Sequence, residues 1–323
     1  MKQNLRVSLG AVVLALATLA AVIYAWINFR QRETYEIPDD GVAWLDTSQG
    51  TEAWKLAPNS PAARAGVRPG DLLISINGTR VDTQVQVTKR LWRAGLWTKV
   101  RYELVRNGES FETQLVTAPA EKPASIENYE RVVGLLYLFI GLFIFVKRWN
   151  APRAVHFFVF CLVSFILYSF HYSGKLDAFD YEVYWAKIAS LMLAPALLLH
   201  FALVFPERAE ATARSASKLG LVYGPPLLLL LFHVSTALNA LGFVPWLGSR
   251  VMLDKIELSY LGIYFLAASL VFYKSFREAP SGVLRQQLKW LTGGTLAGSL
   301  PFALLYIVPF VIDAVPQAWM KFS

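Results

Sequence analysis

The sequence predicts a chain of mixed fold class: an N-terminal membrane anchor helix, a small β-rich domain with two helices, and an all-α six-helix transmembrane bundle. Hydrophobic residues make up 55% of the 323 residues, and the mean hydropathy is +0.41, which is typical of a chain partly embedded in lipid. Seven apolar runs approach the length that crosses a bilayer: residues 7–29, and roughly 132–146, 154–172, 188–205, 219–238, 258–273 and 290–312. Strand and turn patterns lie between the first two runs. We therefore expect an anchor at 1–29, a β-rich domain at 30–118, a linker at 119–130 and a transmembrane region at 131–323.

The first apolar run, Val7–Phe29, is 23 residues long and follows two basic residues. A secretory signal has a shorter apolar region of about 7–15 residues, so an uncleaved anchor is the better interpretation. The small residues Ala15-Leu16-Ala17 keep cleavage open as the alternative. The basic start predicts a cytoplasmic N-terminus and an extracytoplasmic domain after the anchor.

The stretch Asn59–Val81 has the most specific local pattern in the chain. It combines helix-capping residues with glycine and proline turn signals around a short apolar strand. The expected elements are a helix over Pro61–Arg64 capped by Ser60, a left-handed stop at Gly66, a turn at Pro69-Gly70-Asp71, a strand at Leu72–Ile76 and a type I′ turn at Asn77-Gly78.

Alternating apolar residues extend this pattern on both sides. The expected elements are a strand at Gly41–Leu45 and its return at Glu52–Leu56, a helix after Val81 that Asp82 or Thr83 caps and that ends at Gly95, and two strands at Val100–Leu104 and Phe111–Leu115 joined by Asn107-Gly108.

The stretch NSPAARAGVRPGDLLISINGTRV closely resembles the SPA-x-x-AG-x-x-PGD-x-I-x-x-I-x-G element of bacterial PDZ domains, such as those of periplasmic quality-control proteases. The resemblance implies that a peptide or protein ligand extends a strand edge by main-chain pairing, and that a turn captures a C-terminal carboxylate. It places the peptide-binding residues at Gly41, Val42, Ala43 and Trp44, with Gln84, Thr88 and Leu91 on the facing helix.

The loop before Val42 departs from the family pattern, which has an apolar residue just before the glycine. This chain has Asp39-Asp40-Gly41 there. Two carboxylates would repel a free C-terminal carboxylate, so we expect internal or otherwise unusual peptides. For the facing helix, the alternative interpretation is that Leu91 is core and that Gln84 and Thr88 are merely solvated.

The basic residues between the apolar runs predict the orientation of the chain. Because they sit in short links, the net charge of +8 indicates topology signals and no nucleic-acid partner. Acidic neighbours accompany the links with few basic residues: Asp177, Asp180, Asp254 and Glu257. We expect a multi-pass protein of the inner (cytoplasmic) membrane, in contact with the lipid bilayer. The basic links carry Lys147, Arg148 and Arg153; Arg208, Arg214 and Lys218; and Lys274, Arg277, Arg285 and Lys289, whereas the alternate links carry Lys175, or Arg250 and Lys255.

Residues 196–208, ALLLHFALVFPER, and 285–309 resemble the membrane regions of bacterial sensor histidine kinases. In that family another membrane helix and cytoplasmic signalling domains follow. The resemblance implies that the chain is a fragment or truncated product, and that its partner is a cytoplasmic signalling domain, a kinase or phosphatase.

Four histidines, His156, His171, His200 and His233, lie in or beside the apolar runs. A titratable residue at membrane depth is a functional candidate, and His200 is the deepest of them. The alternative is a histidine hydrogen-bonded to a neighbouring helix. The single cysteine, Cys161, excludes an intrachain disulfide and a multi-cysteine metal site.

No catalytic residue, cofactor or metal ligand is expected. The sequence has no H-E-x-x-H zinc motif, no histidine in a soluble domain for a serine-protease triad and no glycine-rich nucleotide-binding segment. The main hypothesis is a membrane-embedded sensory input region of a bacterial signal-transduction protein. The alternatives are a membrane scaffold or adaptor that recruits envelope proteins, and a transporter-like protein with a regulatory PDZ domain.

Overall fold

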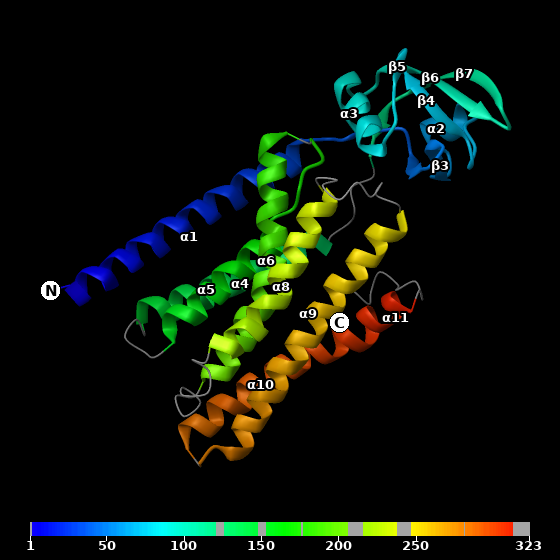
Figure 1. Ribbon diagram of the computed structural model, residues 1–323. Coiled ribbons are helices and arrows are strands. Elements are labelled where there is room, and N and C mark those ends of the chain that lie inside the picture. Colours follow the sequence, from blue (N-terminus) through cyan, green and yellow to red (C-terminus); the bar gives the residue numbers. More distant parts are fainter. Residues whose placement is uncertain are drawn as a thin grey trace. The chain divides into compact units, whose positions relative to one another are not determined.

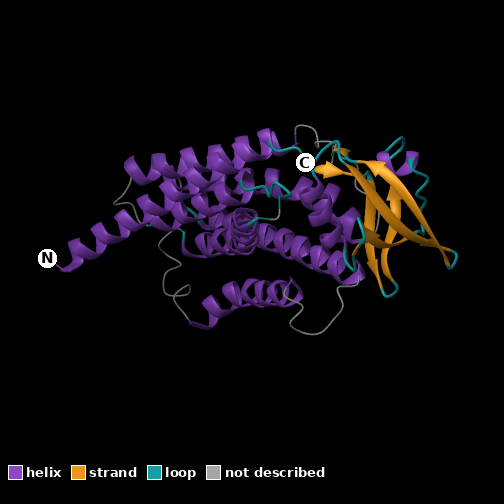
Figure 2. Ribbon diagram, turned by 90° about the horizontal axis from the view of Figure 1, so that it is seen from above, coloured by secondary structure: helices purple, strands orange, loops and turns teal. Residues whose placement is uncertain are grey.

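A computed structural model describes residues 2–120, 126–147, 153–175, 177–205, 216–237, 247–280 and 282–312. The predicted fold class is confirmed: an apolar N-terminal helix precedes a small β-domain, and the rest is mostly helical (Figures 1 and 2). The chain divides into two compact units. The first comprises Met1–Ile126, His171–Tyr184 and Phe243–Arg250, and the second Glu127–Phe170, Trp185–Gly242 and Val251–Ser323.

The β-domain is built on one antiparallel sheet in the order β2-β3-β4-β6-β7, with β5 paired to β4 and a separate pair β1-β8. Two helices, α2 and α3, complete it. The bounds are β1 Pro38–Asp39, β2 Val42–Thr47, β3 Gly50–Leu56, α2 Pro61–Arg64, β4 Leu72–Ile76, β5 Thr79–Arg80, α3 Gln84–Ala94, β6 Lys99–Arg106, β7 Glu109–Val116 and β8 Ala118–Pro119.

The predicted turn and cap chemistry is confirmed in the stretch Asn59–Val81. The Ser60 side chain accepts a hydrogen bond from the Ala63 N–H at the start of α2. Asn77 and Gly78 have φ values of 49° and 72°, as a type I′ turn requires. These local choices set the register of β4, which is the central strand that positions the rest of the sheet.

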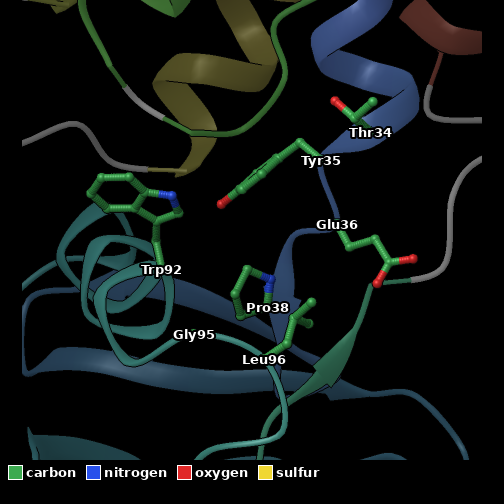
Figure 3. A pocket seen from close by; sticks show the side chains of 7 residues that line it. All are labelled: Thr34, Tyr35, Glu36, Pro38, Trp92, Gly95 and Leu96. Carbon is green, nitrogen blue, oxygen red and sulfur yellow. The ribbon is translucent and has the colours of Figure 1, made fainter.

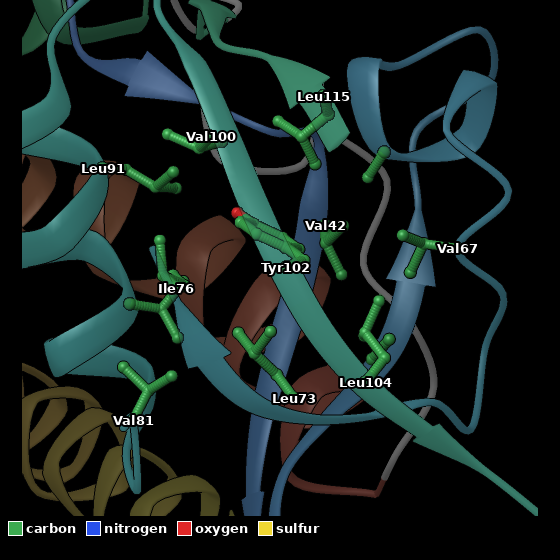
Figure 4. Packing of buried hydrophobic residues seen from close by; sticks show 13 residues of the cluster. Val42, Val67, Leu73, Ile76, Val81, Leu91, Val100, Tyr102, Leu104 and Leu115 are labelled. Atoms are coloured by element: carbon green, nitrogen blue, oxygen red, sulfur yellow. The ribbon is translucent and has the colours of Figure 1, made fainter. Parts of the chain in front are cut away.

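The core of the β-domain is formed by alternating residues of the strands together with one face of α3 (Figure 4). Tyr102 and Leu104 on β6 are fully buried, and Val87 and Leu91 of α3 pack into the same cluster. Every member of the cluster lies between residues 42 and 115. The domain therefore has a hydrophobic core of its own.

The segment after β7 continues the β-domain up to its predicted end and one strand residue beyond it. Thr117 is fully buried and hydrogen-bonds to the 95–98 loop, and Ala118–Pro119 form β8 against β1. Helix α4 begins at Ile126, within the range predicted as a linker. Two-residue strands have no period to detect, so sequence patterns do not reveal β1 and β8.

Six of the described helices are long and apolar enough to cross a membrane, and α5 is a shorter apolar helix. The 16 residues of α5 span about 24 Å, slightly less than the hydrocarbon core. The helix bounds are α1 Lys2–Thr34, α4 Ile126–Lys147, α5 Ala154–Ser169, α6 Ala178–Val204, α8 Ala216–Ala237, α9 Leu247–Glu278 and α10 Val283–Phe302, which continues through the π-helical turn η2 Ala303–Ile307 into α11 Val308–Val311.

Within the second unit, α4 and α5 approach closely at two glycines of α4. A Cβ atom at Gly134 would lie 2.4 Å from Ser169 Oγ, and one at Gly141 would lie 2.6 Å from Cys161 Cβ. Small residues at such positions allow helix backbones to approach in a membrane, where packing replaces the hydrophobic effect as the driving force. Cys161 is accordingly buried.

Within the first unit, the segment between α5 and α6 contacts α1. The Asn28 side chain donates to the His171 carbonyl (2.6 Å) and accepts from the His171 N–H (3.0 Å), and Asn28 is fully buried. The Tyr24 hydroxyl donates to Glu182 Oε2 (2.7 Å). A Cβ at Gly174 would lie 2.6 Å from Ile37, just before β1. The β-domain, α1 and the beginning of α6 therefore belong to one compact unit.

Candidate peptide-binding site

Strand β2 is an edge strand. It pairs with β3 on one side, and no other strand in the described part of the chain pairs with it. Helix α3 lies against β2, and the N–H of Gln84 at the start of α3 donates to Asp46 Oδ1 on β2 (2.6 Å). An edge of this kind leaves alternate N–H and C=O groups available to an added strand.

The loop before β2 folds its own acidic side chains back onto its backbone. Asp40 is fully buried, and three donors converge on its carboxylate: the Val42 N–H on Oδ1 (2.9 Å), and the Trp44 indole N–H (2.9 Å) and the Tyr102 hydroxyl (2.6 Å) on Oδ2. The Asp40 N–H in turn donates to Asp39 Oδ1 (3.0 Å). Two backbone donors of the predicted carboxylate-capturing turn are thus already bonded to carboxylates of the chain itself.

Burial raises the pKa of the Asp40 carboxyl to about 6, and the hydrogen bonds from Tyr102, Val42 and Trp44 oppose that increase. Burial also raises the pKa of the Tyr102 hydroxyl, with the Asp40 charge adding to the effect. At neutral pH the loop therefore holds a buried negative charge, which disfavours a second carboxylate nearby.

Gly41 sits at the centre of this loop and cannot be replaced without strain. Its φ is +77°, and a Cβ there would lie 2.2 Å from Ser60 Cβ. The loop is therefore packed directly on the cap of α2, so its backbone conformation is fixed by the β-domain itself.

The other predicted site residues lie on β2 and on α3, which contacts β2. Ala43 is exposed, whereas Trp44 is half-buried and packs on the core. On α3, Thr88 is half-buried and bonds through its hydroxyl to the Gln84 carbonyl (3.1 Å), whereas Leu91 is in the core cluster. Their roles in peptide binding stay predictions.

The predicted intramembrane candidate, His200, is hydrogen-bonded to a neighbouring helix. Its Nδ1 lies 2.9 Å from the Tyr223 hydroxyl of α8, and its ring packs edge-on against His156, 4.7 Å between centroids. His156 Nε2 lies 2.9 Å from the Leu197 carbonyl. Within the described ranges, no three His, Cys, Asp or Glu side chains are grouped as metal ligands would be.

Sequence reasoning missed a buried, hydrogen-bonded pair of side chains, His233 and Glu257. His233 Nδ1 lies 2.6 Å from Glu257 Oε1, and both side chains are buried. Glu257 was assigned to a link between apolar runs, but it lies inside α9. The sequence does hold a signal for this position: Glu257 is four residues from both Leu253 and Leu261. Residues with this spacing lie on one face of a helix, and all three are buried here.

Comparison with known proteins agrees with the geometry of the β-domain. Residues 55–106 match the PDZ domain family. The chain contains a PDZ domain. The match to the Escherichia coli (strain K12) periplasmic pH-dependent serine endoprotease DegQ is 32% identical over 71 residues, 22% of this chain and 16% of the protease. The match to the magnetosome formation protease MamE of Magnetospirillum gryphiswaldense is 30% identical over 82 residues, 25% of this chain and 11% of that protein.

Solved structures also match part of the chain, among them the two that follow. One is the HtrA-type protease AlgW with a decapeptide (19% identity, TM-score 0.26, 27% of this chain and 31% of that chain). The other is the HtrA3 PDZ domain bound to a phage-derived ligand (17% identity, TM-score 0.24, 27% of this chain and 89% of that chain). The chain spans less than a fifth of the length of the curated relatives it matches. The PDZ domain is of the periplasmic protease type, and the similarity to a sensor-kinase membrane region stays a prediction.

Proposed function

We propose that this chain is the membrane-embedded sensory input region of a bacterial signalling protein, and that its PDZ domain binds an internal segment of a peptide or protein along β2. The observation that carries the proposal is the arrangement around Asp40. Its carboxylate accepts the hydrogen bond of the Val42 N–H, next to a strand edge with which no further strand of the described ranges pairs. Main-chain pairing along the edge stays available, whereas capture of a terminal carboxylate is disfavoured.

Transmission to the membrane helices would use the contacts between α1 and the segment before α6. Asn28 bonds both backbone groups of His171, and Gly174 packs on Ile37 just before β1. These contacts must therefore have two alternative arrangements. A ligand shifts the equilibrium between them only if it binds one arrangement more tightly than the other. The proposed output is a cytoplasmic kinase or phosphatase, either in the same polypeptide or in a partner, and the chain described here is proposed to have no catalytic activity of its own.

The test uses the full chain in lipid nanodiscs and two displayed peptide libraries, one with free C-termini and one with both ends blocked. We expect binders from the blocked library, and N-methylation of alternate backbone amides of a selected peptide should abolish its binding. Thr88→Trp on α3 should weaken binding without unfolding the domain. Recovery of binders from the free C-terminal library alone would contradict the proposed binding mode.

Hydrogen exchange with the selected peptide tests the sensory part separately. Bound peptide should protect β2 and change the exchange of residues 171–184. In Asn28→Leu, protection of β2 should persist while the change at 171–184 is lost, because the bonds to His171 are removed. A peptide that protects β2 and leaves 171–184 unchanged in the unsubstituted chain would favour a scaffold over a sensor.

A further inference from the structure

The end of α3 lies beside the residues that directly follow the first membrane helix. A cavity of about 320 Å³ is lined on one side by Thr34, Tyr35, Glu36 and Pro38, and on the other by Trp92, Gly95 and Leu96 (Figure 3). The Tyr35 hydroxyl points toward Trp92, whereas the Glu36 carboxylate points away from it (Figure 3). All of these residues belong to the first compact unit.

This position is at the outer boundary of the lipid headgroup layer. The apolar run of α1 ends at Phe29, and Tyr35 is six residues further on, a rise of about 9 Å along a helix. Each headgroup layer is roughly 5–8 Å thick, by the difference between total and hydrocarbon thickness. Residues that contact Tyr35 therefore lie at the membrane surface, whichever side of the membrane the domain occupies.

Two tryptophans are exposed at this end of the domain. Trp92 on α3 is 41% exposed, and Trp97 in the following loop is 70% exposed. Tryptophan concentrates at membrane interfaces, because its ring is amphipathic and its N–H needs a polar partner. Two exposed tryptophans close together in the sequence, next to the membrane anchor, are placed as interfacial aromatic residues would be.

The loop holds Trp97 in a strained conformation. Its φ is +56°, in the left-handed region that bulky residues rarely adopt. The buried Thr117 fixes it there: the Trp97 N–H donates to the Thr117 carbonyl (3.1 Å), and the Thr117 hydroxyl donates to the Gly95 carbonyl (2.7 Å). Strain of this kind persists where the surroundings impose it, commonly at functional positions. The exposed ring is thus presented by a fixed loop.

The charged residues of α3 and of the chain that follows it are all basic, whereas the Glu36 carboxylate across the cavity points away from Trp92 (Figure 3). From Thr83 to Tyr102 the chain has five lysines and arginines and no acidic residue. Among the described residues, no carboxylate pairs with the four basic side chains nearest the tryptophans, Lys89, Arg90, Arg93 and Lys99. Unpaired positive charge beside interfacial aromatics is complementary to an anionic lipid surface.

We infer that the end of α3 and the 95–99 loop dock on the anionic headgroups of the bilayer that α1 crosses. Trp92 and Trp97 insert at the interface, and the basic residues contact lipid phosphates. Docking on this face would fix the orientation of the PDZ domain on its anchor, so that the edge of β2 is held in a constant direction relative to the membrane. The docking surface lies toward the C-terminal end of α3 and excludes the edge of β2, so the inference does not depend on a bound peptide.

The test uses the full chain with 5-fluorotryptophan in nanodiscs that contain phosphatidylglycerol. Fluorine resonances are assigned by single Trp→Phe variants. We expect spin-labelled lipid to broaden Trp92 and Trp97, and a soluble gadolinium chelate to broaden Trp54. Trp54 on β3 is the matched control, since it is 53% exposed in the same domain and lies outside the docking surface. Broadening of Trp97 by the gadolinium chelate alone, as for Trp54, would overturn the inference.

A second experiment tests whether the basic residues and the anionic lipid are needed for docking. Replacing Lys89, Arg93 and Lys99 together by Gln should abolish the broadening of Trp97 by spin-labelled lipid, as should nanodiscs made of phosphatidylcholine alone. Persistence of the full broadening under both changes would overturn the role of anionic headgroups. Retained chemical shifts of the core-packed Trp44 would show that the variant is folded.

Discussion

Asp40 shows how one residue can alter what a binding loop accepts. A carboxylate with three donors is stable inside the domain only because each bond offsets part of its desolvation. The sequence revealed that two acids replaced an apolar residue, and hence predicted poor carboxylate capture. It could not reveal that Tyr102 and Trp44 would converge on one oxygen, because these partners are brought together by the sheet.

Asp40 also makes the stability of the PDZ domain depend on pH. The pKa of its carboxyl is about 6 in the folded domain, against about 3.9 for an unfolded aspartate. The folded state therefore binds more protons between pH 4 and 6, and this contribution to stability, present at pH 4, is lost as the pH rises through 6. Two pKa units correspond to roughly 3 kcal/mol.

The prediction concerns the difference in the free energy of unfolding between the 30–120 fragment and its Asp40→Asn variant. From pH 4 to pH 7 the unsubstituted fragment should lose roughly 2–3 kcal/mol of stability relative to the variant. The reason is that Asp40 ionises in its buried site over this range, whereas the asparagine amide does not ionise. Urea unfolding followed by tryptophan fluorescence measures it, and titration of all other groups cancels in the comparison. A difference that stays constant with pH would show that Asp40 is not desolvated.

At the scale of elements, close packing in the helical unit rests on glycines that hydropathy does not detect. Alanine at Gly141 would place its Cβ 2.6 Å from Cys161 Cβ, whereas Gly293 on α10 has nothing within 4 Å. Overpacking costs about 1–3 kcal/mol, and alanine in an open helical position gains up to about 1 kcal/mol over glycine. We expect Gly141→Ala to lower the melting temperature and Gly293→Ala to raise it or leave it unchanged.

The buried thiol of Cys161 provides the measurement. A thiol-reactive fluorogenic dye reports the temperature at which the helical unit opens in detergent micelles, since Cys161 is the single cysteine of the chain. Equal shifts in both variants would mean that α4 and α5 do not approach at Gly141.

Elements defined by local chemistry were predicted well, and those defined by long-range contacts were not. The strand Leu72–Ile76 and the helix ending at Ala94 match the prediction, because caps and turns mark their ends. Helix α9 runs from Leu247 to Glu278 although its apolar run covered only 258–273. Hydropathy detects the part of a helix that needs lipid, while the hydrogen-bonded helix continues into polar flanks that include Glu257.

At the scale of the whole molecule, the orientation in the membrane follows from charge. Three links rich in Lys and Arg alternate with links that carry fewer, and the N-terminal residues Lys2 and Arg6 agree with that alternation. Basic residues near the ends of spans are retained in the cytoplasm. The alternation therefore predicts a cytoplasmic N-terminus and an extracytoplasmic PDZ domain.

Reporter fusions measure this directly. Alkaline phosphatase fused after Ala118 should be active, because it folds only outside the cytoplasm, and the same enzyme fused at Ser215, which lies outside the described residues, should be inactive. β-Galactosidase fusions at the two positions should give the opposite pattern and control for expression. The reverse result at both positions would place the PDZ domain in the cytoplasm. The ligand of the β2 edge would then be a cytoplasmic protein, and the proposed direction of signalling would be wrong, whereas docking of Trp97 on the adjacent headgroups would be unaffected.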